Sequence, residues 1–68
     1  MMASVLKYDG STGVLIDLDG APDCAFQSSD ITQGSIVAGS VVSYDASQNP
    51  RLSQYPQYPR AQNIKLWR

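Results

Sequence analysis

The sequence predicts an all-β protein, a small closed barrel of five antiparallel strands. No stretch of the 68 residues sustains apolar side chains at helical spacing, and β-branched residues gather in short runs. Between these runs, Asp9-Gly10 and Asp19-Gly20 suit tight hairpin turns, because both residue types tolerate positive φ. A closed barrel leaves no exposed sheet edge, so we expect it in preference to the alternative, a small open sheet.

The first three strands follow directly from these turns. Residues 4–9 form the first strand, and residues 13–18, rich in Val and Ile, form the second. Pro22-Asp23 then opens a third strand over residues 24–27. The polar segment 28–30, Ser-Ser-Asp, caps one helical turn at most, because Gly34 ends the segment soon afterwards.

The second half of the domain, which spans residues 1–68, is expected to add two strands. Gly39 precedes a fourth strand over residues 40–44, and residues 60–67 form the last. The segment from about 45 to 59 is polar and contains three prolines, which cannot donate to a sheet ladder. We therefore expect a long loop between these two strands.

Composition limits the classes of function. Lys and Arg total 5 and the acids total 6, all of them Asp, for a net charge of −1. A domain that binds nucleic acid strongly usually presents a basic face, so only weak binding remains compatible with this charge. The single cysteine excludes an internal disulfide, and no signal peptide or apolar run of about 20 residues is present. We expect a cytoplasmic protein that does not enter a membrane.

Residues 13–31, GVLIDLDGAPDCAFQSSDI, resemble the second and third strands of bacterial cold-shock proteins. In that family a Gly-Phe-Ile strand turns through Asp-Gly into Asp-Val-Phe-Val-His-Phe-Ser-Ala-Ile, and the spacing fits without a gap. Residues 5–9, 37–44 and 59–64 are similar to other family segments, so the resemblance covers nearly the whole chain. It implies an OB-fold barrel that binds single-stranded DNA or RNA on outward aromatic side chains, with a gene-regulatory role.

Most of the aromatic residues that the resemblance implies are missing. Tyr8 stands at one aromatic position, whereas the others hold Lys7, Thr12, Val14, Ala25, Gln27 and Ser28. Stacking contributes about 1–3 kcal/mol per base, so the loss of several stacking groups predicts weak binding.

Strand alternation, aligned on the resemblance, predicts which side chains face the core. The expected inward residues are Val5, Leu15, Cys24, Phe26, Val41 and Ile64. The expected outward residues are Val14, Ile16, Ala25 and Gln27, close to Leu6 and Tyr8. Trp67 is expected to plug one end of the barrel. The outward aliphatic face could dock a protein or a second copy of the chain, or lie beneath the long loop.

The expected loop contains a tandem repeat, Gln-Tyr-Pro-Gln-Tyr-Pro at residues 54–59. Tyr-Pro pairs favour extended backbone, which would place Tyr55 and Tyr58 on the same side. With Arg51 and Arg60 nearby, the loop could stack and neutralise a nucleic acid strand. The alternative is a solvated loop that packs one tyrosine on the barrel.

Two hypotheses follow, both non-enzymatic. The first is weak binding of single-stranded nucleic acid through Lys7, Tyr8, Val14, Gln27, Tyr55, Tyr58 and Arg60. The second is a protein-interaction module with an interface formed by Leu6, Val14, Ile16 and Ala25. The choice between monomer and homodimer stays open.

The sequence predicts no catalytic residue, metal site or cofactor. The chain has no histidine that could activate Cys24, whose place in a strand indicates a buried hydrophobic side chain. Asp17, Asp19 and Asp23 surround a turn, but their spacing is not that of an EF-hand. Aspartates in turns usually bond their own backbone instead.

Overall fold

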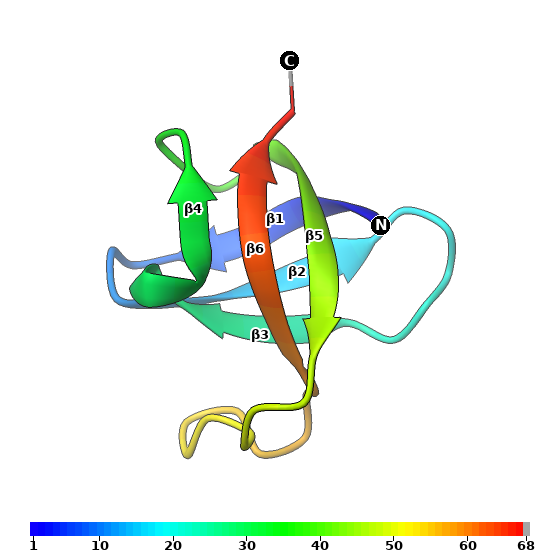
Figure 1. Cartoon of the computed structure of the whole chain (residues 1–68), viewed down its shortest axis with the longest axis vertical. Coiled ribbons are helices and arrows are strands. Elements are labelled where there is room, and N and C mark those ends of the chain that lie inside the picture. Colours follow the sequence, from blue (N-terminus) through cyan, green and yellow to red (C-terminus); the bar gives the residue numbers. More distant parts are fainter. Residues whose placement is uncertain (68) are drawn as a thin grey trace.

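The computed structural model describes residues 1–67 and shows a closed barrel with one short additional strand (Figure 1). The strands are β1 (Met2–Tyr8), β2 (Thr12–Asp17), β3 (Cys24–Gln27), β4 (Ile31–Gln33), β5 (Val41–Ser47) and β6 (Arg60–Leu66). Neighbours in the sheet follow the order β3-β2-β1-β5-β6-β4, and an additional β3–β6 pairing closes the barrel. The predicted barrel of five strands is therefore confirmed, but the β3–β6 pair that closes it is parallel, whereas the prediction was antiparallel throughout.

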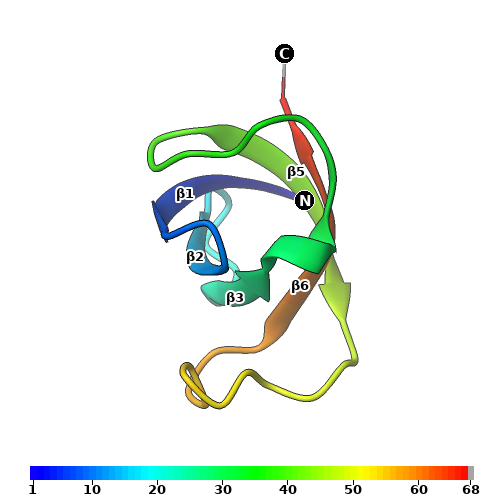
Figure 2. The ribbon, with the colours of Figure 1, turned by 90° about the vertical axis from the view of Figure 1, so that its left-hand side faces the viewer.

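Two features of the chain path differ from the prediction. A single 3-10 turn over Ser28–Asp30 leads into β4, a strand that the sequence did not predict and that runs parallel to β6. Strand β5 continues to Ser47, because Asp45, Ala46 and Ser47 pair with β6. The long loop is consequently 48–59, and Figure 2 shows it leaving β5 and curling back beneath β3.

The core lies inside the barrel and is centred on Phe26. Its fully buried ring stacks on Tyr8, with centroids 5.3 Å apart. Gly13 faces Phe26 across the β2–β3 pair, and a Cβ at this position would lie 2.6 Å from the ring's Cζ. Only glycine lets β2 pass this close to the ring. The predicted inward residues Val5, Leu15, Cys24, Phe26 and Ile64 are all buried in this core.

The prediction that Val41 faces the core was wrong. Val42 and Tyr44 occupy the core instead, and Val41 is half-exposed on the outside. The register explains this, because Val42 lies opposite the buried Ala3, whereas Val41 lies opposite Ser4 on the outer face.

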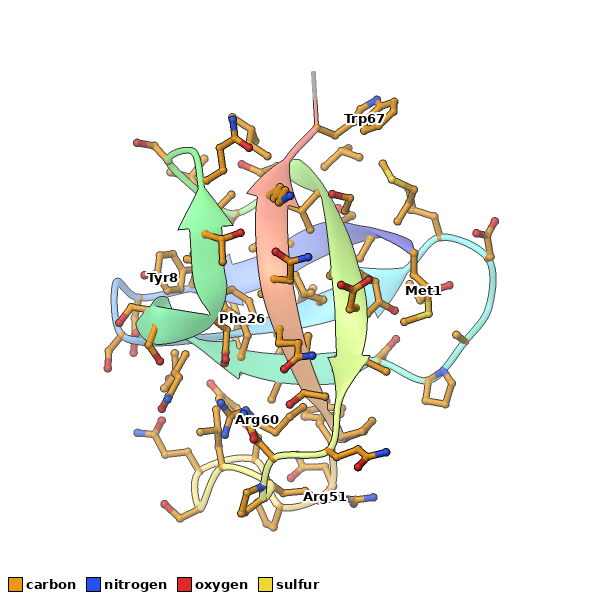
Figure 3. The ribbon with its side chains drawn as sticks, in the orientation of Figure 1. Met1, Tyr8, Phe26, Arg51, Arg60 and Trp67 are labelled. Carbon is orange, nitrogen blue, oxygen red and sulfur yellow. The ribbon has the colours of Figure 1, made fainter. Side chains whose placement is uncertain are left out.

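The prediction that Trp67 plugs the barrel was also wrong, because its side chain is 60% exposed. Its backbone N–H donates to the carbonyl of Val41, so Trp67 continues the outer face past the end of β6. Figure 3 shows Trp67 at one end of the barrel and Arg51 and Arg60 at the other.

Candidate binding surface

One row of outer side chains crosses four strands of the barrel. The register pairs Lys7 with Val14, Val14 with Ala25, and Ala25 with Arg60. A β-bulge in β1 precedes Lys7, because Val5 pairs with Leu15 but Lys7 pairs with Val14. The extra residue lets Lys7 stay on the outer face beside Val14.

The middle of this row is buried, although it lies outside the barrel core. Val14 is 1% exposed and Ala25 is 0% exposed, yet neither belongs to the core cluster. The expectation of an exposed aliphatic face was therefore wrong at these two positions, and the alternative, a face that lies beneath the long loop, agrees with the burial of Val14 but not with the exposed Ile16. Of the four residues predicted for a protein interface, only Leu6 and Ile16 remain exposed, at 53% and 39%.

Loop 48–59, called the strap from here on, covers the buried residues of the row. Thr12, two residues before Val14 on the same face, donates its hydroxyl to Gln54 Oε1 at 2.8 Å. Lys7 Nζ lies 5.1 Å from the centroid of the Tyr55 ring, and the Ala25 N–H donates to the Pro59 carbonyl at 2.8 Å. Three of the outer neighbours of Val14 thus contact the strap, as expected for a loop packed over the row.

Arg60, predicted to contact nucleic acid, is instead a buried structural residue, 7% exposed. Its Nη2 donates to Asp30 Oδ2 at 2.8 Å in a buried ion pair, and its Nη1 donates to the Pro50 carbonyl at 3.0 Å. The same Asp30 oxygen accepts the Gln27 N–H at 2.9 Å. Arg60 therefore ties the strap and the 3-10 turn to the base of β6. Its Nε has no hydrogen-bond partner in the described part of the chain but is buried, so the guanidinium is not accessible to a phosphate.

The strap gathers two tyrosines and two cations at one place. The rings of Tyr55 and Tyr58 have centroids 6.0 Å apart and are tilted by 48°. Arg51 donates from Nη1 to the Pro56 carbonyl at 3.0 Å, and Lys7 approaches the other side of the cluster from β1. Lys7 and Arg51 are exposed, and both tyrosines are half-buried. We call Lys7, Arg51, Tyr55 and Tyr58 the strap patch.

The seven residues predicted to contact nucleic acid therefore do not form one site. The structure brings Lys7, Tyr55 and Tyr58 together and buries Val14 and Arg60. The half-buried Tyr8 stacks on Phe26, and Gln27 donates its amide to Ser29 Oγ at 2.8 Å.

A second outer surface, away from the strap, carries exposed apolar side chains. Ile16 lies opposite Ser4, and Ser4 lies opposite Val41, whose carbonyl accepts the Trp67 N–H. We call Ile16, Val41 and Trp67 the apolar row. Leu18 extends it, since its N–H donates to the Met2 carbonyl and its side chain is exposed. The outward position of Ile16, which strand alternation predicted, was the sequence signal for this face.

A cavity of about 210 Å³ opens beside Cys24 and Tyr44, near the start of β3. Burial raises the pKa of the Cys24 thiol, which disfavours the reactive thiolate. Burial also raises the pKa of Tyr44, whose hydroxyl donates to Asp17 Oδ2 at 2.5 Å. The raised pKa values keep the Cys24 thiol and the Tyr44 hydroxyl protonated at neutral pH, and the Tyr44 hydroxyl stabilises the ionised Asp17 carboxylate.

Comparison with protein-family models, with curated proteins and with solved structures found no match. Within residues 1–67, no helix has the length and apolarity needed to cross a membrane.

Proposed function

We propose that this chain is a non-enzymatic, cold-shock-like binding module with an OB-fold barrel, which binds single-stranded DNA or RNA weakly and serves in gene regulation. The sequence resemblance supports the family, and the closed barrel of β1, β2, β3, β6 and β5 is compatible with the five-stranded OB architecture. Function on such a barrel still depends on the site, because the same fold hosts unrelated activities.

The observation that carries this proposal is the strap patch. Proteins that bind single strands combine aromatic side chains, on which bases stack, with cations along the backbone path. Tyr55 and Tyr58 lie 6.0 Å apart, and Lys7 and Arg51 flank them. The loop therefore carries some of the aromatic stacking groups that the strands lack.

The small number of stacking and charged groups in the patch limits its affinity for nucleic acid. Two stacking tyrosines contribute about 2–6 kcal/mol at most, at about 1–3 kcal/mol per base. The net charge of −1 adds little long-range attraction for a polyanion. We therefore expect a dissociation constant on the order of a millimolar at low salt.

A titration of the protein with oligothymidine at low salt, followed by amide chemical shifts, tests the proposal. Saturable shifts are expected at Lys7, Tyr55 and Tyr58, and added salt should weaken them because exposed cations make the phosphate contacts. Tyr58→Ala should weaken binding by roughly fivefold to a hundredfold, the loss of one stacked base. Trp67→Ala, a change of an exposed aromatic residue at the opposite end, is the matched control and should leave binding unchanged. Shifts that fail to saturate, or that centre on Trp67, would contradict the proposal.

A second candidate function is protein interaction, favoured by the apolar row. Ile16 and Val41 lie on either side of Ser4 on the outer face, and Trp67 lies beside Val41. Apolar side chains grouped on an outer face in this way are typical of protein contacts rather than of nucleic acid contacts. This interface differs from the predicted one, because Val14 and Ala25 lie under the strap and Leu6 and Ile16 stay exposed.

A further inference from the structure

We propose that the strap is a self-occluding lid, and that the form which binds a single strand best is the one in which the strap has released Thr12 and Lys7. This inference rests on the proposed function and concerns the regulation of the same site. It assigns two states to the loop: closed, as in this structure, and open at its tip.

The two ends of the strap are held firmly. Near its start, the Pro50 carbonyl accepts a hydrogen bond from the buried Arg60, which is fixed by its ion pair with Asp30. At its end, the Pro59 carbonyl accepts the N–H of the buried Ala25. The Pro59 contact belongs to the barrel closure and the Pro50 contact is made by a buried, ion-paired side chain, so the ends of the strap stay in place while the barrel is folded.

The tip of the strap is held by weaker contacts. Gln54 reaches Thr12 through a solvent-exposed hydrogen bond, and Tyr55 meets Lys7 only through a cation–π contact at 5.1 Å. Exposed contacts of both kinds contribute about 1 kcal/mol or less each, because water competes for the same groups. The tip is therefore the part of the strap that opens at the lowest cost.

The tip has its own internal hydrogen bonds, so it can move as one unit. The Tyr55 N–H donates to the Leu52 carbonyl at 3.0 Å, and the Tyr58 N–H donates to the Tyr55 carbonyl at 3.1 Å. Arg51 adds a bond to the Pro56 carbonyl. These bonds can persist when the tip leaves the sheet, which keeps Tyr55 and Tyr58 together.

Opening uncovers a floor suited to a nucleobase and a phosphate. Val14 and Ala25 form a small apolar surface across β2 and β3, and Lys7 borders it on β1. In the closed state the Lys7 ammonium lies over the Tyr55 ring. On opening, the ammonium becomes available to a phosphate and the ring becomes available to a base. Contacts with the nucleic acid then replace the contact between Lys7 and Tyr55.

The closed state lowers the apparent affinity, because only the open fraction presents the complete site. Variants that remove the tip contact should therefore bind more tightly. Gln54→Ala and Thr12→Val each delete the same hydrogen bond from opposite sides, and each should tighten oligothymidine binding by about two- to fivefold. The double variant should gain no more than either single variant.

Gln57→Ala, a change of the exposed second glutamine of the repeat, is the matched control and should bind like the wild type. The Val14 methyl signals report the floor and should shift with oligothymidine in the released variants. If Gln54→Ala and Thr12→Val bind no more tightly than the wild type while the wild type binds, the lid is excluded and the proposed function stands. If neither the wild type nor any variant binds, the proposed function and the lid are both excluded.

Discussion

At the scale of single residues, Asp17 connects the end of β2 to the core. One of its oxygens accepts the Tyr44 hydroxyl at 2.5 Å, and the other accepts the N–H groups of Asp19 and Ala21 at 2.7 and 3.2 Å. Donors that bind the ionised form lower the pKa of the Asp17 carboxyl, and the Tyr44 hydroxyl has the largest effect. The bond also gives the buried Tyr44 hydroxyl the partner that burial demands.

Tyr44→Phe is predicted to make the protein less sensitive to acid. A carboxyl with a depressed folded-state pKa stabilises the fold above its unfolded pKa of about 4, and this stabilisation is lost as pH falls through the folded pKa. Without the hydroxyl, the Asp17 pKa rises toward its ordinary value, so less stability is lost between pH 5 and pH 2, roughly the range of the titration. Urea unfolding across this range measures the change. Tyr58→Phe is the control, and equal pH slopes for Tyr44→Phe and the wild type would contradict the prediction.

At the scale of elements, the pairing of β5 with β6 contains a bulge at Asn63. Ser43 pairs with Lys65 and Asp45 pairs with Gln62, so β6 carries one residue more than β5 between these pairs. Asn63 takes up this extra residue with a φ of 54°, in the left-handed region. Its side chain is held on both sides, since its Nδ2 donates to Asp45 and its Oδ1 accepts from Thr32.

Because of the bulge, we predict that glycine is more stable than alanine at position 63, which reverses the usual order in a strand. Asn63→Gly and Asn63→Ala lose the same side-chain bonds, but alanine pays about 1–2 kcal/mol for the left-handed conformation and glycine does not. Asn63→Gly should therefore be more stable than Asn63→Ala by about 1 kcal/mol in denaturant unfolding. At the neighbouring Gln62, an exposed and regularly paired position, Gly should be the less stable of the two. The same order at both positions would contradict the assignment of the bulge.

Local sequence patterns predicted much of the fold but could not locate these irregularities. The hairpin dipeptides and prolines placed strand β3 and the turn at residues 28–30, because these signals act within a few residues. The side of Val41 depended on pairing with Ser4, far away in the chain. The burial of Val14 and Arg60 likewise depends on the strap and on Asp30, contacts that no local pattern encodes. The sequence therefore predicted the tyrosines and Lys7 of the site, but it left open whether the long loop covers the Val14 floor, because that choice depends on these distant contacts.

At the scale of the whole molecule, the barrel presents two unlike outer surfaces. The strap closes one of them with its own tyrosines, whereas the apolar row of Ile16, Val41 and Trp67 lies uncovered on the other. A net charge of −1 provides little long-range repulsion between copies of a small protein. Contact between two apolar rows removes apolar area from water, and this favours self-association at high concentration.

We therefore expect a weak dimer through the apolar row, measured by sedimentation over a range of protein concentrations. Ile16→Lys should weaken association by roughly tenfold or more, because burial of one such side chain is worth about 1.5–3 kcal/mol. Val37→Lys is the matched control: Val37 is exposed, at 64%, but lies in the loop before β5 and outside the apolar row. If both changes weaken the dimer equally, the contact lies elsewhere or the weakening is a general effect of the added charge. A monomer at every concentration would exclude self-association as the role of this surface. Dimerisation that leaves oligothymidine binding unchanged would establish that the two surfaces act independently.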